Sequence, residues 1–394
     1  IIHLFFFFFS MERTSAKVLA SKGDAVSRAL GSLSGHPDQR VQAVRTLESQ
    51  ALNPQARSSI IALGGAKMLV ALLVRPSDQV LPFEKIRIAK TLATLAASPP
   101  CRAVIINAGS IPQLIRLLGG LPEAQAAAIT ALLALAPQKG SRGLMVAHGS
   151  LEVISQAFKQ PDNFEEQTRM CQLLVSILEG ESVEERMPRV LAVVQSQDTV
   201  TGLVRLLSSS SEGILQAASA VALICCENSL RGHLMEAGAL TALKKLLTHG
   251  EAAVVEQALE AIAAVVTLDV SDGQDGQPGL SNTTLDMEEM LSGEVALVVR
   301  QLQGATEEIR CAASHVTFRL AARGDIEIPL RAAEPLPALV SLIRVGQART
   351  RAWAASALRL LSTTSDARET VTQSVPMEVE GREKLLAKIR MLCF

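Results

Sequence analysis

The stretch MEAGALTALKKLL, residues 235–247, places a glycine turn at Gly238 directly before an amphipathic helix that ends in a leucine-rich run. Glycine adopts left-handed backbone angles without steric cost, so Gly238 can turn the chain between two helices. The apolar residues of the run recur at helical spacing, which predicts a helix with one buried face. Related stretches occur along the chain: GGAKMLVALL at 64–73, AGSIPQLIRLL at 108–118, HGSLEVI at 148–154, DTVTGLVRLL at 198–207, GEVALVV at 293–299 and EPLPALV at 334–340.

The copies recur with a period of roughly forty residues, which is typical of stacked helical repeats. The anchor residues 65, 109, 149, 198, 238, 293 and 334 are separated by 44, 40, 49, 40, 55 and 41 residues. One unit has too few apolar residues to close its own core, so neighbouring units must bury a continuous core together. A second, longer helix rich in alanine and leucine is predicted over residues 84–97, 123–136, 212–226, 252–268 and 349–362.

The composition also indicates closely packed helices. The 394 residues are 48% hydrophobic but only 3% aromatic, so the core must be built from aliphatic side chains and alanine. The 38 lysines and arginines nearly balance the 39 aspartates and glutamates, which leaves a net charge of −1. Without a strong overall field, nucleic acid is not an expected partner. No stretch reaches the roughly 18 uncharged apolar residues that span a bilayer, so a membrane is not expected either.

The junction at residues 230–247 resembles an armadillo repeat, in which a long third helix precedes a glycine turn and a short pair of helices. The resemblance covers residues 30–365 and implies an all-α fold, a right-handed α-solenoid of armadillo-type repeats. HEAT repeats are the alternative, because the two families differ chiefly in whether the first helix is bent or split. Junctions of the Ala-Gly-Ala-Leu type favour armadillo repeats.

The resemblance implies that the third helices line a concave groove for an extended peptide or a partner's helix. Nuclear transport adaptors of this type hold basic peptides with paired tryptophan and asparagine residues, which do not occur at the corresponding positions here. The only tryptophan, Trp353, is interpreted as a packing residue, with a groove anchor as the alternative. Aligned by the apolar frame, the groove residues are expected to be Arg45, Lys90, Thr94, Thr130, Gln172, Ser176, Ser219, Glu260, Ser356 and Arg359.

The function expected from this resemblance is that of a non-catalytic scaffold or adaptor that binds a protein partner or an extended peptide. Its expected location is the cytoplasm, with the nucleus as a second compartment. Two alternatives stay open. One is a substrate-recruiting armadillo subunit, or a fragment, of a ubiquitin-ligase pathway protein, although the sequence contains no ligase module. The other is a nuclear transport adaptor for basic signals, which the groove residues disfavour.

The sequence does not predict an enzyme. The six histidines lie far apart and are interpreted as surface or turn residues, and none forms a metal-binding pair with a second histidine or a cysteine. The adjacent Cys225 and Cys226 point in different directions on one helix and are interpreted as core residues. Glutamate pairs such as Glu307 and Glu308 lie near predicted helix starts, where the helix dipole favours them. No catalytic residue, cofactor or metal ligand is therefore predicted.

Three segments flank or interrupt the repeats. Residues 1–29 are expected to be disordered or, before Met11, not native, with a signal peptide as the alternative. Residues 269–291 hold six acidic and no basic residues and are expected to form a disordered surface insertion. A calcium loop is disfavoured there, because the aspartates fall three apart rather than two. Residues 366–394 are expected to be a tail whose amphipathic end caps the last repeat, with a membrane-lying helix as the alternative.

Overall fold

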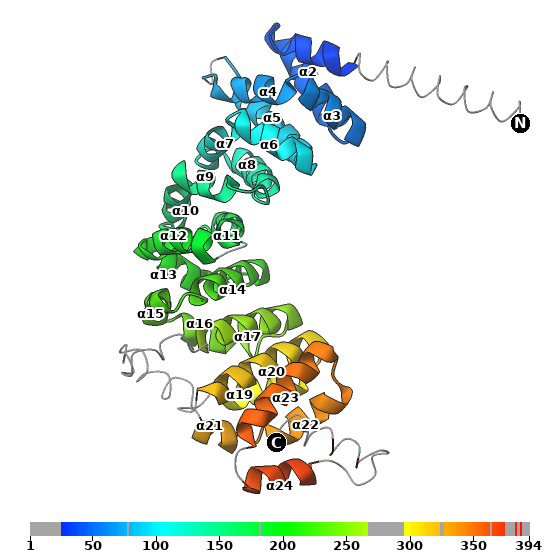
Figure 1. Cartoon of the computed structure of the whole chain (residues 1–394). Coiled ribbons are helices and arrows are strands. Elements are labelled where there is room, and N and C mark those ends of the chain that lie inside the picture. Colours follow the sequence, from blue (N-terminus) through cyan, green and yellow to red (C-terminus); the bar gives the residue numbers. More distant parts are fainter. Residues whose placement is uncertain are drawn as a thin grey trace, which may run out of the picture. The chain divides into compact units, whose positions relative to one another are not determined.

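The computed structural model describes residues 25–76, 79–180, 183–266, 295–323, 327–362 and 365–374, together with Glu383 and Ala387. Throughout this part of the chain the regular structure is helical and no strand is formed (Figure 1). The predicted all-α fold is therefore confirmed. Residues 1–24, the acidic insertion predicted at 269–291 and nearly all of the predicted tail helix lie outside the described residues.

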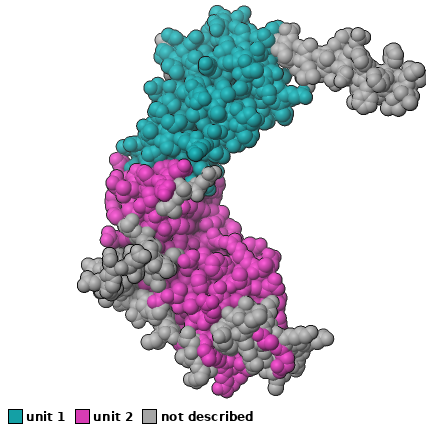
Figure 2. Space-filling model, viewed as in Figure 1, with its two compact units in different colours: residues 1–157, 172–180 teal, residues 158–171, 181–394 magenta. Residues whose placement is uncertain are grey.

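The chain divides into two compact units (Figure 2). Unit 1 comprises residues 1–157 and 172–180, and unit 2 comprises residues 158–171 and 181–394. The division falls within α11 (Phe164–Leu178).

Unit 1 is built from long helices separated by pairs of short ones. The long helices α2, α5 and α8 have 14 or 15 residues, whereas the short helices have seven to ten. The helices are α2 (Pro37–Gln50), α3 (Pro54–Ala62), α4 (Gly65–Val74), α5 (Pro82–Ala96), α6 (Pro99–Asn107), α7 (Ser110–Leu118), α8 (Pro122–Leu135), α9 (Ser141–Ala147) and α10 (Ser150–Phe158), the last residue of which belongs to unit 2.

Unit 2 repeats the same succession of short and long helices. Its long helices are α14, α17, α20 and α23. The elements are α12 (Val183–Val194), α13 (Gln197–Leu206), α14 (Ser211–Cys225), α15 (Asn228–Glu236), α16 (Ala239–Leu246), α17 (Ala252–Val266), α19 (Val295–Arg300), the 3-10 turn η1 (Gln301–Gln303), α20 (Glu307–Ala322), α21 (Glu327–Ala332), α22 (Leu336–Val345), α23 (Ala348–Leu361) and α24 (Ser365–Gln373).

The predicted turn glycines have left-handed backbone angles. Gly64, Gly109, Gly149 and Gly238 have φ values of 77°, 80°, 85° and 84°. Gly109 separates α6 from α7, and Gly238 separates α15 from α16. Glu334 takes the corresponding position before α22, with a φ of 53°. Because a side chain with a Cβ atom costs about 1–2 kcal/mol in this conformation, Glu334 is a strained member of a glycine series.

The long helices pack side by side within each unit (Figure 1). In unit 1, α5 lies between α2 and α8, and in unit 2 the neighbours run α14, α17, α20 and α23. Alanine and aliphatic side chains are fully buried on these helices, for example Ala89 on α5, Ala128 on α8 and Ala258 on α17. Small residues let the helices approach closely. The long helices end within two residues of the predicted bounds.

A repeated arginine joins each of several long helices to the short helix that follows it. The arginine lies on the short helix. Its guanidinium group donates to the carbonyl oxygen of the residue six positions earlier, which lies at the C-terminal end of the long helix. The carbonyl groups at a helix C-terminus lack partners within the helix, and a cation also suits the negative end of the helix dipole. The pairs are Arg57 with Ala51 at 2.6 Å, Arg102 with Ala96 at 2.8 Å, Arg231 with Cys225 at 3.1 Å and Arg368 with Ser362 at 3.1 Å.

A buried ion pair ties α2 to α5 in unit 1. Arg40 and Glu84 are 5% and 0% exposed, and their side chains meet through two contacts of 3.3 and 3.2 Å. Arg40 also donates to the carbonyl oxygen of Gln79 at 2.8 Å, and Glu84 accepts from the backbone amide of Leu81 at 3.0 Å. The Glu84 carboxylate therefore accepts hydrogen bonds both from the backbone at the start of its own helix and from Arg40.

Replacing Arg40 by alanine is expected to lower the free energy of unfolding by about 3–5 kcal/mol, because Glu84 would remain buried without its counter-charge. Denaturant titration followed by circular dichroism measures this loss. The control is Arg45→Ala on the same helix, where the side chain is exposed and the change should stay within about 0.5 kcal/mol. Equal losses in both variants would contradict the role of the buried pair.

Replacing Glu334 by glycine is expected to stabilise unit 2 by about 1 kcal/mol, because glycine removes the strain of the left-handed backbone. Glu334→Ala is the matched control, since it removes the carboxylate but keeps the Cβ atom and the strain. The fluorescence of Trp353, the one tryptophan of the chain, reports unfolding of this unit. A similar gain in both variants would show that the carboxylate, and not the backbone, is unfavourable.

Candidate functional site

In unit 1 the predicted groove residues occupy matching positions on neighbouring long helices. Arg45 on α2, Lys90 on α5 and Thr130 on α8 are exposed, and each directly follows two buried residues. Because α5 lies between α2 and α8, these three side chains form a row across neighbouring helices. This position, which is the same along each long helix, is called the register below. The remaining predicted residues of this unit are Thr94, half-buried on α5, and Gln172 and Ser176, exposed and half-buried on α11.

In unit 2 the corresponding position recurs on four neighbouring long helices, α14, α17, α20 and α23. Ser219 on α14 and Ser356 on α23 are half-buried at this register, and Glu260 on α17 is exposed. Arg359, also exposed, lies one turn after Ser356. Helix α20 lies between α17 and α23 but carries none of the predicted groove residues.

The structure places His315 at this register on α20, with Arg319 one turn later. Sequence reasoning missed both residues. The signal was present, because His315 precedes Ser356 by 41 residues, the same step that separates anchor residues 293 and 334. His315 is half-buried in the middle of a long helix, so of the predicted surface or turn location the turn is wrong.

His315 belongs to an aromatic cluster between α20 and α23. Its imidazole stacks on the indole of Trp353, with ring centres 4.3 Å apart and planes 27° from parallel. The ring of Phe318 lies 5.4 Å from the indole, and the guanidinium carbon of Arg319 lies 5.9 Å from the Phe318 ring centre. The prediction that Trp353 packs is confirmed, and its side chain remains half-exposed.

The imidazole of His315 is neutral in this setting. Burial, and then repulsion from Arg319 and Arg349, lowers the pKa of His315 to about 4. Arg319 donates its Nε proton to the Nε2 atom of the ring over 3.1 Å. Since arginine only donates, Nε2 must accept and the neutral ring carries its proton on Nδ1. The cluster therefore presents a flat, uncharged ring pair flanked by two guanidinium groups.

Carboxylates gather on the neighbouring helix instead. Burial, with repulsion from Glu260 and Glu308, raises the pKa of Glu256. Glu256 and Glu260 lie one turn apart on α17, and Glu308 lies in the first turn of α20. This part of unit 2 is thus divided by charge, with carboxylates on α17 and in the first turn of α20, and guanidinium groups later on α20 and on α23.

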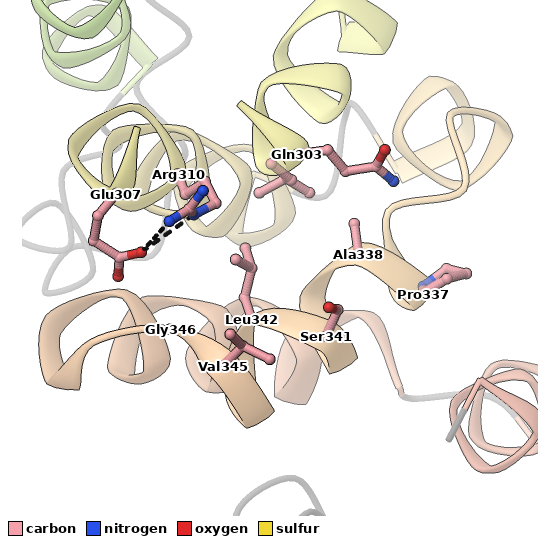
Figure 3. Close-up of a pocket in the computed structure, with 10 residues that line it drawn as sticks. Gln303, Glu307, Arg310, Pro337, Ala338, Ser341, Leu342, Val345 and Gly346 are labelled. Carbon is pink, nitrogen blue, oxygen red and sulfur yellow. Dashed lines mark hydrogen bonds and ion pairs between the residues drawn. The ribbon is translucent and has the colours of Figure 1, made fainter. Parts of the chain in front are cut away.

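A second feature of unit 2 is a hollow of about 400 Å³ between the start of α20 and α22 (Figure 3). Glu307 lies at its edge and accepts hydrogen bonds from Arg310 at 2.8 Å, from the amide of Gln347 at 2.7 Å and from the hydroxyl of Thr350 at 2.7 Å. Burial opposes ionisation, but these hydrogen bonds together hold the pKa of Glu307 below its usual range. The carboxylate therefore joins α20 to the start of α23.

Other sites offer less chemistry. Within the described ranges, no group of three or more histidine, cysteine, aspartate or glutamate side chains is arranged to hold a metal ion. Cys225 is buried as predicted, and burial raises its pKa to about 12, but Cys226 is exposed, so its predicted core role was wrong. No single described helix is long and apolar enough to cross a membrane; α3 and α4 reach that length and composition only as a pair bent by 72°.

Replacing His315 by phenylalanine should keep an aromatic ring against Trp353 but remove the group that can bind a proton at this position. The folded-state pKa of about 4 lies below the ordinary value of 6.5, so between these values the unfolded chain binds a proton that the folded chain does not. The wild type should therefore lose stability relative to His315→Phe as the pH falls from about 7 to about 4.5. Unfolding midpoints from Trp353 fluorescence measure this difference, and a constant difference would contradict the lowered pKa.

Comparison with known proteins identifies the architecture alone. No family model matches the chain, and no curated protein matches it. Similar solved structures include three engineered proteins, each a Northeast Structural Genomics Consortium target. Target OR497 has 20% identity and a TM-score of 0.60 over 94% of this chain and 98% of its own. Targets OR329 and OR366 have 29% and 25% identity and TM-scores of 0.53, over 61% of this chain and 96% and 98% of their own. These likenesses support the all-helical, repeat-like fold.

Proposed function

We propose that the chain is a non-catalytic scaffold or adaptor that binds a protein partner, as an extended peptide, along the exposed register of its long helices. The observation that carries the proposal is this register itself. Arg45, Lys90 and Thr130 repeat at one position of neighbouring helices in unit 1, and Ser219 and Glu260 do so in unit 2. A peptide can contact such a series at regular intervals along its length.

We further propose that the repeats are of the armadillo type and form a right-handed solenoid. Two short helices precede each long helix in several repeats, and α3 and α4 meet at 72°. The left-handed glycines Gly109 and Gly238 separate such pairs cleanly. A split first pair of helices favours armadillo over HEAT repeats. In this arrangement the long helices line the inner face, which is where the proposal puts the partner.

The chemistry of the register suits binding rather than catalysis. The cysteine thiols of Cys171 and Cys225 have raised pKa values because they are buried, which disfavours the reactive thiolate. Glu307 is engaged by three donors, two of which join α20 to the start of α23. Aromatic and arginine side chains, by contrast, are typical of the residues that contribute most to protein interfaces. The proposal places this activity in the cytoplasm and extends it to the nucleus.

The proposal predicts that long side chains on the register will remove the partner. Thr130→Arg and Ser219→Arg should each lower recovery of a specific copurifying protein from native extract, because arginine would occupy the space of the peptide. Gln55→Arg and Thr241→Arg place the same side chain at exposed positions on the short helices α3 and α16 and should leave recovery unchanged. Quantitative mass spectrometry of the purified complexes gives the measurement.

Circular dichroism of each variant establishes that the helices are intact. If the register variants keep the partner while a short-helix variant loses it, the partner binds another face and the proposed binding surface is wrong. If no variant changes recovery of any protein, the exposed register of the long helices has no binding role.

A further inference from the structure

The cluster between α20 and α23 has the chemistry of a docking site for an acidic side chain. The aromatic–arginine patch is defined by His315, Phe318, Arg319, Arg349 and Trp353. Its indole and imidazole stack at 4.3 Å, and both rings are half-exposed. Arg319 lies one turn after His315, and Arg349 lies one turn before Trp353. Two neighbouring helices therefore each bring one guanidinium group to the same ring pair.

Both guanidinium groups lack a carboxylate partner within the described part of the chain. Arg319 makes a hydrogen bond to a neutral ring nitrogen, which leaves its charge uncompensated. Arg349 is exposed and forms no ion pair with a described residue. Arg40 and Arg186 differ in this respect, since they pair with Glu84 and Glu227 at 3.2 and 2.8 Å.

The electrostatic surroundings of the ring pair are positive. The charged groups that act on His315 are Arg319 from its own helix and Arg349 from α23, and both repel a proton. The carboxylates Glu256, Glu260 and Glu308 act on one another at α17 and the start of α20. Charge complementarity therefore favours an anionic group over the ring pair and disfavours it over α17.

The spacing of the helices fits an extended chain. Packed helices lie about 8–10 Å apart, and an extended peptide advances about 3.3 Å per residue. A peptide that crosses the register thus meets a new long helix about every three residues. If such a peptide places a carboxylate at the patch, the peptide residue about three positions away lies over Glu260 on α17. An acidic residue is therefore favoured at only one of the two contacts.

We propose that the aromatic–arginine patch docks an aspartate- or glutamate-bearing extended segment of a partner protein. The carboxylate accepts hydrogen bonds from Arg319 and Arg349, and the hydrocarbon part of the side chain and the adjoining peptide backbone lie on Trp353. Arginine suits this role because its planar group can meet both carboxylate oxygens. The inference rests on the proposed function, for which it names the chemistry of the ligand at one repeat.

Fluorescence titration of the full chain tests the patch directly, because Trp353 is the one tryptophan present. The probe is a synthetic twelve-residue peptide without tryptophan that carries a single glutamate among glycine, serine and alanine. The matched peptide carries glutamine instead. The glutamate peptide should shift the emission of Trp353 and bind at least about threefold more tightly than the glutamine peptide, and rising salt should reduce this difference.

Variants locate the contact. Arg319→Gln and Arg349→Gln should each lower the affinity for the glutamate peptide by about three- to tenfold and leave the affinity for the glutamine peptide unchanged. Arg349 is exposed, so its variant keeps the test valid if Arg319→Gln disturbs the ring stack. Glu260→Lys should tighten binding, because it removes the neighbouring carboxylate charge. Thr241→Lys adds the same cation on α16 and should have no effect.

Equal binding of the two peptides, or an arginine variant without effect, would overturn the inference. A gain in affinity when the six acidic residues of 269–291 are changed to their amides would also overturn it, since the occupant would then be this chain's own insertion. The proposed function fails separately, because its test scores recovery of a natural partner at Thr130 and Ser219, outside the patch. If the Thr130 or Ser219 variant loses the partner but the patch shows no preference for the glutamate peptide, the proposed scaffold function stands and the inference of an acidic ligand fails.

Discussion

Contact between neighbouring long helices is the constraint on which the rest of the structure depends. An isolated repeat has one long helix and two short ones, which is too little apolar surface for a core of its own. Fully buried alanines such as Ala89, Ala128 and Ala258 keep the helices close, and the aliphatic residues around them fill the remaining space. With 3% aromatic residues, the chain has few large side chains that could force the helices apart.

Polar groups hold this apolar stack in register. Each joint satisfies backbone or side-chain groups that packing alone would leave unpaired, as Arg57 does for the carbonyl oxygen of Ala51 and Arg231 for that of Cys225. Glu307 links α20 to α23 through Gln347 and Thr350, and Arg40 with Glu84 links α2 to α5. Hydrogen bonds are directional, so these joints fix the positions that unspecific apolar contact leaves free.

The same stacking creates the candidate binding surface. A long helix that packs against its neighbours and the short helices on most of its circumference leaves one stripe open to solvent. Side chains of that stripe then recur from helix to helix at one register, where polar residues carry no burial cost. In unit 2 this register also gathers His315 and Trp353 from adjacent helices, so an aromatic surface forms from two residues 38 positions apart in the sequence.

The sequence by itself determined the helical class, the repeat period, the turn glycines and the bounds of the long helices, because these follow from short-range backbone preference and from apolar spacing within one repeat. It also located the exposed register at residues such as Lys90 and Glu260. Only the tertiary structure decided the pairing of His315 with Trp353, the neutral state of that histidine, and the joints of Arg40 and Glu307. These depend on which side chains meet across neighbouring helices, and helical periodicity within one segment carries no information about such meetings.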